Sequence, residues 1–224
     1  MFYLYQMHSI SEENYIKAIY HLQVGQALVS TNDIAGRMKT KASSVTDMLK
    51  KLADKNLAEY IPYKGARLTE NGVQCANQII RKHRLWEVFL VEKLDFSWDE
   101  VHDVAEQLEH IQSQKLIDQL DKHLEFPKKD PHGDPIPDRN GNYEKTSKTI
   151  LSKLQKGDRG TLIGLIDSST KFLNYLDKQN MKLGTSMEVV DFEEFDHSYT
   201  IKMNEQQLQV SQQIADNLYI KLDK

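Results

Sequence analysis

Residues 30–52 read STNDIAGRMKTKASSVTDMLKKL, and this stretch decides the fold of the first part of the chain. Residues that favour helix N-termini open it at Ser30-Thr31-Asn32-Asp33, and a short helix is expected to follow as far as Met38. After a break of three or four residues, a second helix is expected over Ser43–Leu52. Two short helices joined by a tight turn are typical of the helix-turn-helix motif of DNA-binding proteins. The predicted inner faces are Ile34, Ala35 and Met38, then Val45, Met48, Leu49 and Leu52.

The segments on either side complete a winged helix-turn-helix. Upstream, Ser11–Gln23 is predicted to be a helix with its first residue as the N-cap, because apolar residues recur at helical spacing. Downstream, Leu57–Pro62 and Arg67–Thr69 are predicted strands around a short turn. This hairpin would form the wing, with Lys64 and Arg67 placed to meet DNA phosphates.

The local charge of this region favours contact with DNA. Residues 36–67 hold eight basic and three acidic side chains, a net charge of +5 in a chain whose formal net charge is −4. Binding to the phosphate backbone requires such a concentration of positive charge, and small polar residues at the start of the second helix can approach base edges. The alternative is a winged helix used only for protein contacts. The predicted DNA-contacting residues are Arg37, Lys39, Lys41, Ser43, Ser44, Thr46, Asp47, Lys50, Lys64 and Arg67.

The composition of the whole chain limits the class of protein. Hydrophobic residues make up 39% and charged residues 28% of the 224 residues, which is ordinary for soluble globular proteins. No run approaches the roughly 18 apolar residues that span a bilayer. The single cysteine, Cys75, rules out an internal disulfide and fits a reducing cytosol. We therefore expect a cytoplasmic protein without a membrane partner.

Changes in composition and in hydrophobic pattern along the sequence divide the chain into three predicted domains, at residues 1–70, 71–147 and 148–224. The second is helical and ends in a connector, because four of the five prolines lie between Pro127 and Pro137 and exclude regular helix there. The third is predicted to be a small β domain. It has three strand-like runs and one helix, at Thr161–Ile166, Met187–Phe192, Tyr199–Met203 and Lys171–Asn180.

Six histidine and glutamate side chains are grouped on two predicted helices of the second domain. One helix is expected over residues 98–124, where four candidate ligands recur within a sector about 100° wide. A second helix, starting Arg81-Lys82-His83-Arg84, places two more one turn apart. Facing helices that project His and Glu inward are a known way to build a metal site. The six residues are His102, Glu106, Glu109 and His110 on the first helix, and His83 and Glu87 on the second.

The ligand types limit the metal. Nitrogen and carboxylate oxygen without sulfur suit Mn²⁺, Fe²⁺, Co²⁺ and Zn²⁺, and a carboxylate-rich set favours Mn²⁺ or Fe²⁺. The alternative is that these groups form surface ion pairs, which are common at i, i+4 spacing. His132 lies in the rigid loop Asp130-Pro131-His132-Gly133-Asp134, which is also capable of ligation.

These segments together resemble the diphtheria toxin repressor and manganese transport regulator family of metalloregulators, along nearly the whole chain. The resemblance implies a homodimer in which each subunit holds a winged helix, a dimerisation domain and a C-terminal SH3-like barrel related to the FeoA module. The segments that carry it are Glu13–Tyr20, Ser43–Thr46, Arg81–Leu85, Val101-His102 with Glu109-His110, and Pro131–Gly133 with Ile136-Pro137.

The resemblance also implies roles for individual residues. A primary, regulatory metal site would use Glu106, Glu109 and His110 with Asn14 from the first helix. An ancillary site would use His83, Glu87 and His102, and in the three-domain manganese branch the connector would add Asp130 and His132.

Four positions depart from the family pattern. Asn14 stands where iron-type members carry Met and manganese-type members often carry Asp, so this ligand would bring no charge. Lys17 stands where some two-domain manganese regulators place a ligating Glu, and Ser43 replaces a common proline. Glu106 stands where iron-type members have Cys, and a carboxylate in place of a thiolate favours Mn²⁺ over softer metals.

The resemblance therefore predicts a repressor, not an enzyme. Loaded with Mn²⁺, or alternatively Fe²⁺, the homodimer would bind palindromic double-stranded operator DNA and control metal-uptake genes, with no small organic ligand. One alternative is a winged-helix regulator that senses a non-metal effector. Another is a metalloenzyme that uses the His/Glu cluster with an open coordination position.

Overall fold

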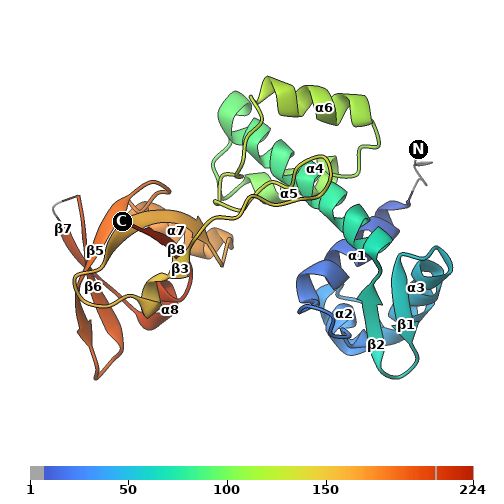
Figure 1. Ribbon diagram of the computed structural model, residues 1–224, viewed down its shortest axis with the longest axis horizontal. Coiled ribbons are helices and arrows are strands. Elements are labelled where there is room, and N and C mark those ends of the chain that lie inside the picture. The colour runs from blue at the N-terminus through green and yellow to red at the C-terminus, as the bar shows by residue number, and fades with distance from the viewer. Residues whose placement is uncertain (1–7, 205, 224) are drawn as a thin grey trace. The chain divides into compact units, whose positions relative to one another are not determined.

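The helices and strands of the computed structural model, which describes residues 8–204 and 206–223, are labelled in Figure 1. The chain folds into two compact units whose boundary runs through its helical region. Unit 1 contains the described residues up to 86, with 105–126 and 136–143, and unit 2 contains 87–104, 127–135 and 144–223. The described part of the chain contains no helix that is both long and apolar enough to cross a membrane.

Unit 1 begins with α1 (Ile10–Leu22), whose start is fixed by a reciprocal capping box. The Ser9 hydroxyl accepts a hydrogen bond from the backbone N–H of Glu12, and the Glu12 carboxylate accepts one from the N–H of Ser9. Two backbone donors at the helix start are satisfied in this way. The prediction that Ser11 is the N-cap is therefore wrong, because Ser11 lies in the first turn.

The helix-turn-helix consists of α2 (Thr31–Arg37) and α3 (Ala42–Asp54). The Ser30 hydroxyl caps α2 by accepting a hydrogen bond from the N–H of Asp33 at 3.1 Å, as the cluster of capping residues predicts. Val45 and Leu49, both predicted for the inner face of α3, are fully buried in the core shared with α1.

The wing is a two-stranded antiparallel hairpin of β1 (Ala58–Ile61) and β2 (Gly65–Leu68). An isolated bridge between Val29 and Ala66 adds the segment before α2 to it. Gly65 is required there, since a Cβ at this position would come within 2.2 Å of the Val29 carbonyl oxygen. The predicted winged helix-turn-helix is thus confirmed.

The helical region between Glu70 and His123 contains three helices, whereas the sequence predicts two. They are α4 (Glu70–Leu94), α5 (Val101–Leu108) and α6 (Gln114–His123). The single helix predicted over residues 98–124 is wrong, because the Ser113 hydroxyl accepts a hydrogen bond from the N–H of Leu116 and starts a new helix. The helix expected to start at Arg81 instead begins at Glu70, a full eleven residues earlier.

Arg81 of α4 ties α6 and the connector into unit 1. Its guanidinium donates to the Pro137 carbonyl at 2.7 Å and to the Asp121 carboxylate at 2.6 Å. The side chain of Arg81 is only 6% exposed, so these two acceptors are what compensate for burying its charge. The connector is therefore ordered, as its prolines predict.

Unit 2 is built around a six-stranded antiparallel sheet with the strand order β3-β8-β4-β5-β6-β7. Shifts of register in the β4–β8 and β5–β6 pairs mark bulges, which bend strands and increase their twist. The curved sheet packs with a helix around one core, and the expected C-terminal SH3-like domain is confirmed (Figure 1). The strands are β3 (Thr149–Ile150), β4 (Arg159–Leu165), β5 (Ser186–Glu193), β6 (Ser198–Met203), β7 (Gln206–Val210) and β8 (Leu218–Leu222).

The predicted helix of this domain is α7 (Thr170–Lys178). Phe172, Leu173 and Leu176 are buried, so its apolar stripe faces the core. A short 3-10 helix at Leu151–Lys153 and α8 (Gln212–Ala215) complete unit 2.

Gly133 lets the connector approach β4 closely. The N–H of Leu165 donates to the His132 carbonyl at 3.1 Å, and Gly133 has a φ of +89°. A Cβ on Gly133 would lie 2.3 Å from the Ile163 carbonyl oxygen and 2.5 Å from the Gly164 Cα, both backbone atoms. Only glycine fits this contact without moving the chain.

We predict that Gly133→Ala destabilises unit 2 more than Gly157→Ala does. Gly157 is a matched control because its φ is +91° and a Cβ there would meet open space. Both variants incur the cost of a left-handed alanine, about 1–2 kcal/mol, but only Gly133→Ala adds a collision with backbone. Urea unfolding of the two variants measures the difference, and equal midpoints would contradict the close approach.

Candidate metal centres and nucleic-acid interface

The predicted DNA-contacting residues of the helix-turn-helix lie on an accessible surface. Ser43, Ser44, Asp47 and Lys50 are exposed on α3, and Thr46 is half-buried. No side chain of the described residues caps α3, since its N-cap position is Lys41. Helix N-termini attract phosphate through free N–H groups and the helix dipole, so the start of α3 is suited to a DNA backbone. The other predicted contacts on these elements, Arg37, Lys39 and Lys41, are also exposed.

The two predicted phosphate contacts of the wing differ. Lys64 is exposed beside Tyr63 at the tip of the hairpin. Arg67 is half-buried and pairs with the Glu59 carboxylate at 2.7 Å, while it also donates to the Gln26 carbonyl at 3.3 Å. Arg67 therefore holds the wing together, and Lys64 is the more accessible cation.

Two of the four residues predicted for the primary metal site, Glu106 and Glu109, meet at Lys17 of α1. The Lys17 ammonium lies 2.6 Å from Glu109 Oε2 and 3.3 Å from Glu106 Oε1. It also lies 3.4 Å from Nδ1 of His83. We call Glu106, Glu109 and His110 the Glu109 cluster.

Glu109 is the most deeply buried member of this cluster, with a side chain that is 1% exposed. Its Oε2 also forms a hydrogen bond with His83 Nδ1 at 2.6 Å. Burial alone would raise the pKa of Glu109, but the hydrogen bond with His83 and the charge of Lys17 outweigh it and lower the pKa below its ordinary value. Glu109 therefore carries its negative charge inside unit 1.

His110, the third member, is held by Glu13. Its Nδ1 lies 2.5 Å from Glu13 Oε2, and its Nε2 lies 3.9 Å from Glu109 Oε1. A carboxylate accepts only, so Nδ1 carries the proton and Nε2 offers a lone pair toward Glu109. Metal-ligating histidines commonly donate their second ring N–H to a carboxylate in this way. The donor set thus fits a divalent cation between His110 and Glu109.

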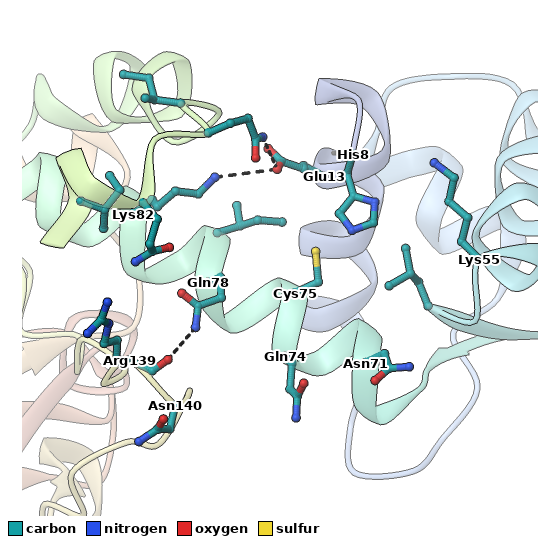
Figure 2. A pocket seen from close by; sticks show the side chains of 16 residues that line it. His8, Glu13, Lys55, Asn71, Gln74, Cys75, Gln78, Lys82, Arg139 and Asn140 are labelled. Carbon is teal, nitrogen blue, oxygen red and sulfur yellow. Dashed lines mark hydrogen bonds and ion pairs between the residues drawn. The ribbon is translucent and has the colours of Figure 1, made fainter. Parts of the chain in front are cut away.

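Glu13 is itself fixed by several groups. Its Oε1 accepts a hydrogen bond from Gln112 at 2.8 Å and lies 3.7 Å from the Lys82 ammonium. Glu13 and Lys82 line a cavity of about 670 Å³ in unit 1, and Figure 2 shows the contact between them. Burial lowers the pKa of Lys82, and raises the pKa of Cys75 in the same cavity to about 12. A thiol with that pKa stays protonated at neutral pH and is a poor nucleophile.

Asn14, the ligand that the family resemblance implies from α1, is half-buried. Among the described residues, no hydrogen bond joins it to Glu106, Glu109 or His110. Neither its neighbour Glu13 nor Lys17 is among the site residues predicted from the sequence. Their i, i+4 spacing on α1 was the available signal, because it puts both on one helix face.

A second group of candidate ligands lies in unit 2. Ligand atoms of Glu87, Asp130 and His132, which we call the Glu87 cluster, all lie within 4.8 Å of one another. The three residues are 2%, 5% and 6% exposed. Two carboxylates buried so close together repel each other unless a cation or proton lies between them. The structure therefore brings together a connector loop and α4, far apart in sequence, in an arrangement suited to a cation.

Hydrogen bonds orient the two connector ligands. Nε2 of His132 lies 2.7 Å from the Trp98 carbonyl oxygen, which only accepts, so Nε2 donates and Nδ1 offers its lone pair. That Nδ1 lies 3.9 Å from Glu87 Oε2. Oδ1 of Asp130 accepts from the backbone N–H groups of His132 and Asp134, both at 2.9 Å. Trp98 in turn donates to Asp177 of α7 at 2.9 Å, which fixes the loop that supplies the carbonyl.

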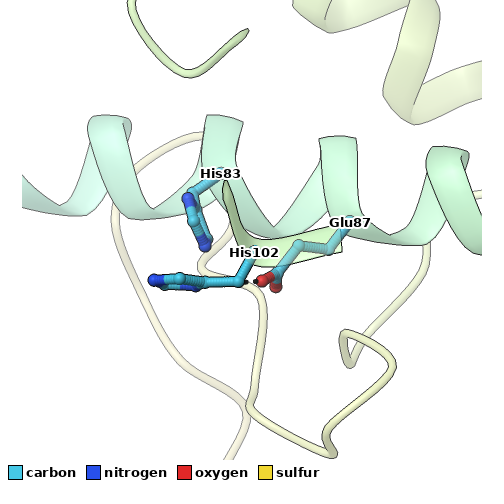
Figure 3. Close-up of side chains that lie close together, drawn as sticks. All are labelled: His83, Glu87 and His102. Carbon is cyan, nitrogen blue, oxygen red and sulfur yellow. Dashed lines mark ion pairs between the residues drawn. The ribbon is translucent and has the colours of Figure 1, made fainter. Parts of the chain in front are cut away.

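Of the predicted ancillary ligands, His102 lies beside Glu87 within unit 2. Nδ1 of His102 lies 3.6 Å from Glu87 Oε1, and His83 precedes Glu87 by one turn of α4 (Figure 3). His102 is half exposed, so this side of Glu87 is open to solvent.

Three family models match almost the whole chain. "Iron dependent repressor, N-terminal DNA binding domain" matches residues 7–66, and "Iron dependent repressor, metal binding and dimerisation domain" matches residues 69–138. The FeoA domain matches residues 149–222.

Known proteins agree with these matches. The HTH-type transcriptional regulator MntR of Oceanobacillus iheyensis is 31% identical over 120 residues, which cover 54% of this chain and 81% of that protein. The iron-dependent repressor IdeR of Mycobacterium tuberculosis is 32% identical over 56% of this chain, and the match spans 54% of its own length. The solved structure of a manganese-dependent transcriptional repressor in complex with manganese has a TM-score of 0.82 at 31% identity, covering 93% of this chain and 98% of that one.

The contact between Glu13 and His110 leads to a prediction about metal affinity. We expect Glu13→Gln to weaken divalent metal binding about 10- to 100-fold, because the carboxylate that orients His110 is lost. Glu12→Gln is the matched control, since the neighbouring Glu12 pairs with Lys55 at 2.6 Å, away from the cluster. Calorimetric titration of both variants gives the comparison. Equal affinities in the two would mean that Glu13 does not orient a ligand.

Proposed function

The chain belongs to the family of iron-dependent repressors and manganese transport regulators, and from this premise we propose that it represses metal-uptake genes as a Mn²⁺-loaded homodimer. Members of this family are metal-dependent transcriptional regulators and not enzymes, so the metalloenzyme alternative no longer stands. Operator binding and dimerisation are properties of the family, and the matched dimerisation domain covers residues 69–138.

A regulatory metal is supported by the fact that the side chains around Glu109 come from two separate segments of unit 1. Glu13 and Lys17 come from α1, which packs in the core of the winged helix, whereas Glu109 and His110 follow α5. All of these residues lie within unit 1. Glu106, Glu109 and His110 would hold the primary ion, with Asn14 as the ligand from α1. A divalent ion, when bound, supplies positive charge that neutralises carboxylates from both segments.

The donor set favours Mn²⁺, with Fe²⁺ as the alternative. Glu106 and Glu109 bring two carboxylates and His110 one imidazole, and carboxylate oxygen suits the harder metals. The names of the similar proteins include both iron-dependent and manganese-dependent repressors. Glu87, Asp130 and His132 would hold a second ion in unit 2, with His83 and His102 as further ancillary ligands.

Metal ligation would affect DNA binding through the relative placement of the two recognition helices in the dimer. Two recognition helices α3, one from each subunit, must match half-sites about one helical turn apart in a palindromic operator. Ligands that fix α1 against the segment after α5 also fix the direction of α3, because α1 and α3 share one core. Without metal, the recognition helices would sample many orientations, of which only a fraction match the operator. The apparent affinity for DNA would then be reduced by that fraction.

The proposal is tested by fluorescence anisotropy with a labelled palindromic fragment from a metal-transporter promoter. Metal-stripped protein is titrated into the labelled DNA in the presence of chelator, of Mn²⁺, or of Fe²⁺ under anaerobic conditions. The salt concentration is kept constant and no organic effector is added. We expect tight binding only with metal, and weaker binding when one half-site is scrambled. Equal binding with chelator and with metal would contradict the proposal and favour a non-metal effector.

Glu109→Ala is predicted to abolish metal-dependent DNA binding while leaving the dimer intact, because it removes a buried primary ligand. Glu92→Ala is the matched control, since Glu92 is an exposed glutamate of α4 outside both clusters. Anisotropy measures DNA binding, and analytical ultracentrifugation measures the dimer. A Glu109→Ala variant that keeps the metal response would refute the assignment of the primary site.

A further inference from the structure

The ammonium group of Lys17 lies where a cation would bind the Glu109 cluster. Its three neighbours, at 2.6, 3.3 and 3.4 Å, are Glu109 Oε2, Glu106 Oε1 and His83 Nδ1. An ammonium group has donors only, and two of them reach the oxygens of Glu109 and Glu106; Nδ1 of His83 donates to Glu109, so it lies beside the ammonium without accepting from it. Each neighbour is also a residue predicted to bind a metal ion.

Lys17 and a metal ion cannot use Glu109 in the same way at the same time. Bonds from Zn²⁺ and similar ions to carboxylate oxygen are about 2.0–2.2 Å long. The two oxygens belong to one carboxylate, so an ion bound to Glu109 Oε1 beside His110 would still lie close to the ammonium, which is now 2.6 Å from Oε2. Two cations so close repel each other strongly in a site with little water.

We propose that Lys17 is an internal competitor of the regulatory metal, and that it sets the metal concentration at which the protein responds. The ammonium neutralises Glu109 and Glu106 when it occupies the cluster, and it must move away when the ion binds. This inference rests on the proposed function. It goes further by assigning to one residue the threshold of the metal response.

Burial distinguishes this role from that of an ordinary surface ion pair. The side chain of Lys17 is 12% exposed and that of Glu109 is 1% exposed. A pair in such surroundings is screened little by water, so the competition is strong. The Lys55–Glu12 pair has the same 2.6 Å separation and also involves α1, but lies away from the cluster and has a lysine that is 35% exposed.

The two possible roles of Lys17 predict opposite changes in metal affinity. If Lys17 only stabilised the fold, its removal would loosen α1 and weaken metal binding. If it competes with the ion, its removal takes one positive charge away from two carboxylates, so that metal binding becomes tighter while the metal-stripped protein becomes less stable.

The test compares Lys17→Met with Lys55→Met, which removes the matched lysine. Mn²⁺ affinity is measured by calorimetry, and thermal unfolding is followed in chelator and in saturating Mn²⁺. For Lys17→Met we expect Mn²⁺ affinity at least about tenfold tighter than wild type, a lower melting temperature in chelator and a larger rise on adding Mn²⁺. Lys55→Met should keep the wild-type affinity. Lys17→Gln, which retains a polar side chain, should shift affinity in the same direction if Lys17→Met does not fold.

Failure of the inference and failure of the proposed function give different results. Unchanged or weaker Mn²⁺ binding by both Lys17 variants, with wild type binding normally, would overturn the role of Lys17 alone. A wild-type protein that binds neither Mn²⁺ nor Fe²⁺ at micromolar concentrations would refute the proposed function, and the inference would fall with it.

Discussion

The buried carboxylate of Glu109 is the constraint on which the arrangement of unit 1 depends. One of its oxygen atoms meets both Lys17 of α1 and His83 of α4 at 2.6 Å. A buried negative charge must be compensated, and α1 and α4 each supply one of these two partners. Because α1 also forms the core of the winged helix, the compensation of a single charge links the DNA-binding part of the unit to its helical part.

Both clusters contain a histidine in which one ring nitrogen already donates a hydrogen bond. His110 donates to Glu13, and His132 donates to the Trp98 carbonyl. In each case the remaining lone pair points toward a buried glutamate. This geometry sets the tautomer before any ligand arrives, so little rotation of the ring is required on binding. A loop residue such as Trp98 therefore contributes to the site by orienting His132, although it is not itself a candidate metal ligand.

The sequence was most informative where a single local signal controls the outcome. Capping residues at Ser30 and the spacing of Val45, Leu49 and Leu52 predicted the helix-turn-helix, and prolines predicted the connector. The break between α5 and α6 was missed because Ser113 interrupts a stretch whose apolar spacing continues on both sides of it. The strand β7 was missed because it is a glutamine-rich edge strand with one buried residue, Val210, and so lacks apolar alternation. Candidate ligands were found by residue type, whereas the i, i+4 spacing of Glu13 and Lys17 shows only that they share a helix face, and their tertiary contacts show what that face meets.

The central claim is that metal ligation fixes the direction of the recognition helices, and a distance measurement tests it most directly. A dye pair is attached through Asp54→Cys at the end of α3, in a Cys75→Ala background, and energy transfer between the subunits of the dimer is recorded. The account predicts a broad distribution of distances in chelator that becomes narrow with Mn²⁺, in step with the gain in DNA binding. The same distribution in both conditions, with DNA binding still dependent on metal, would contradict it.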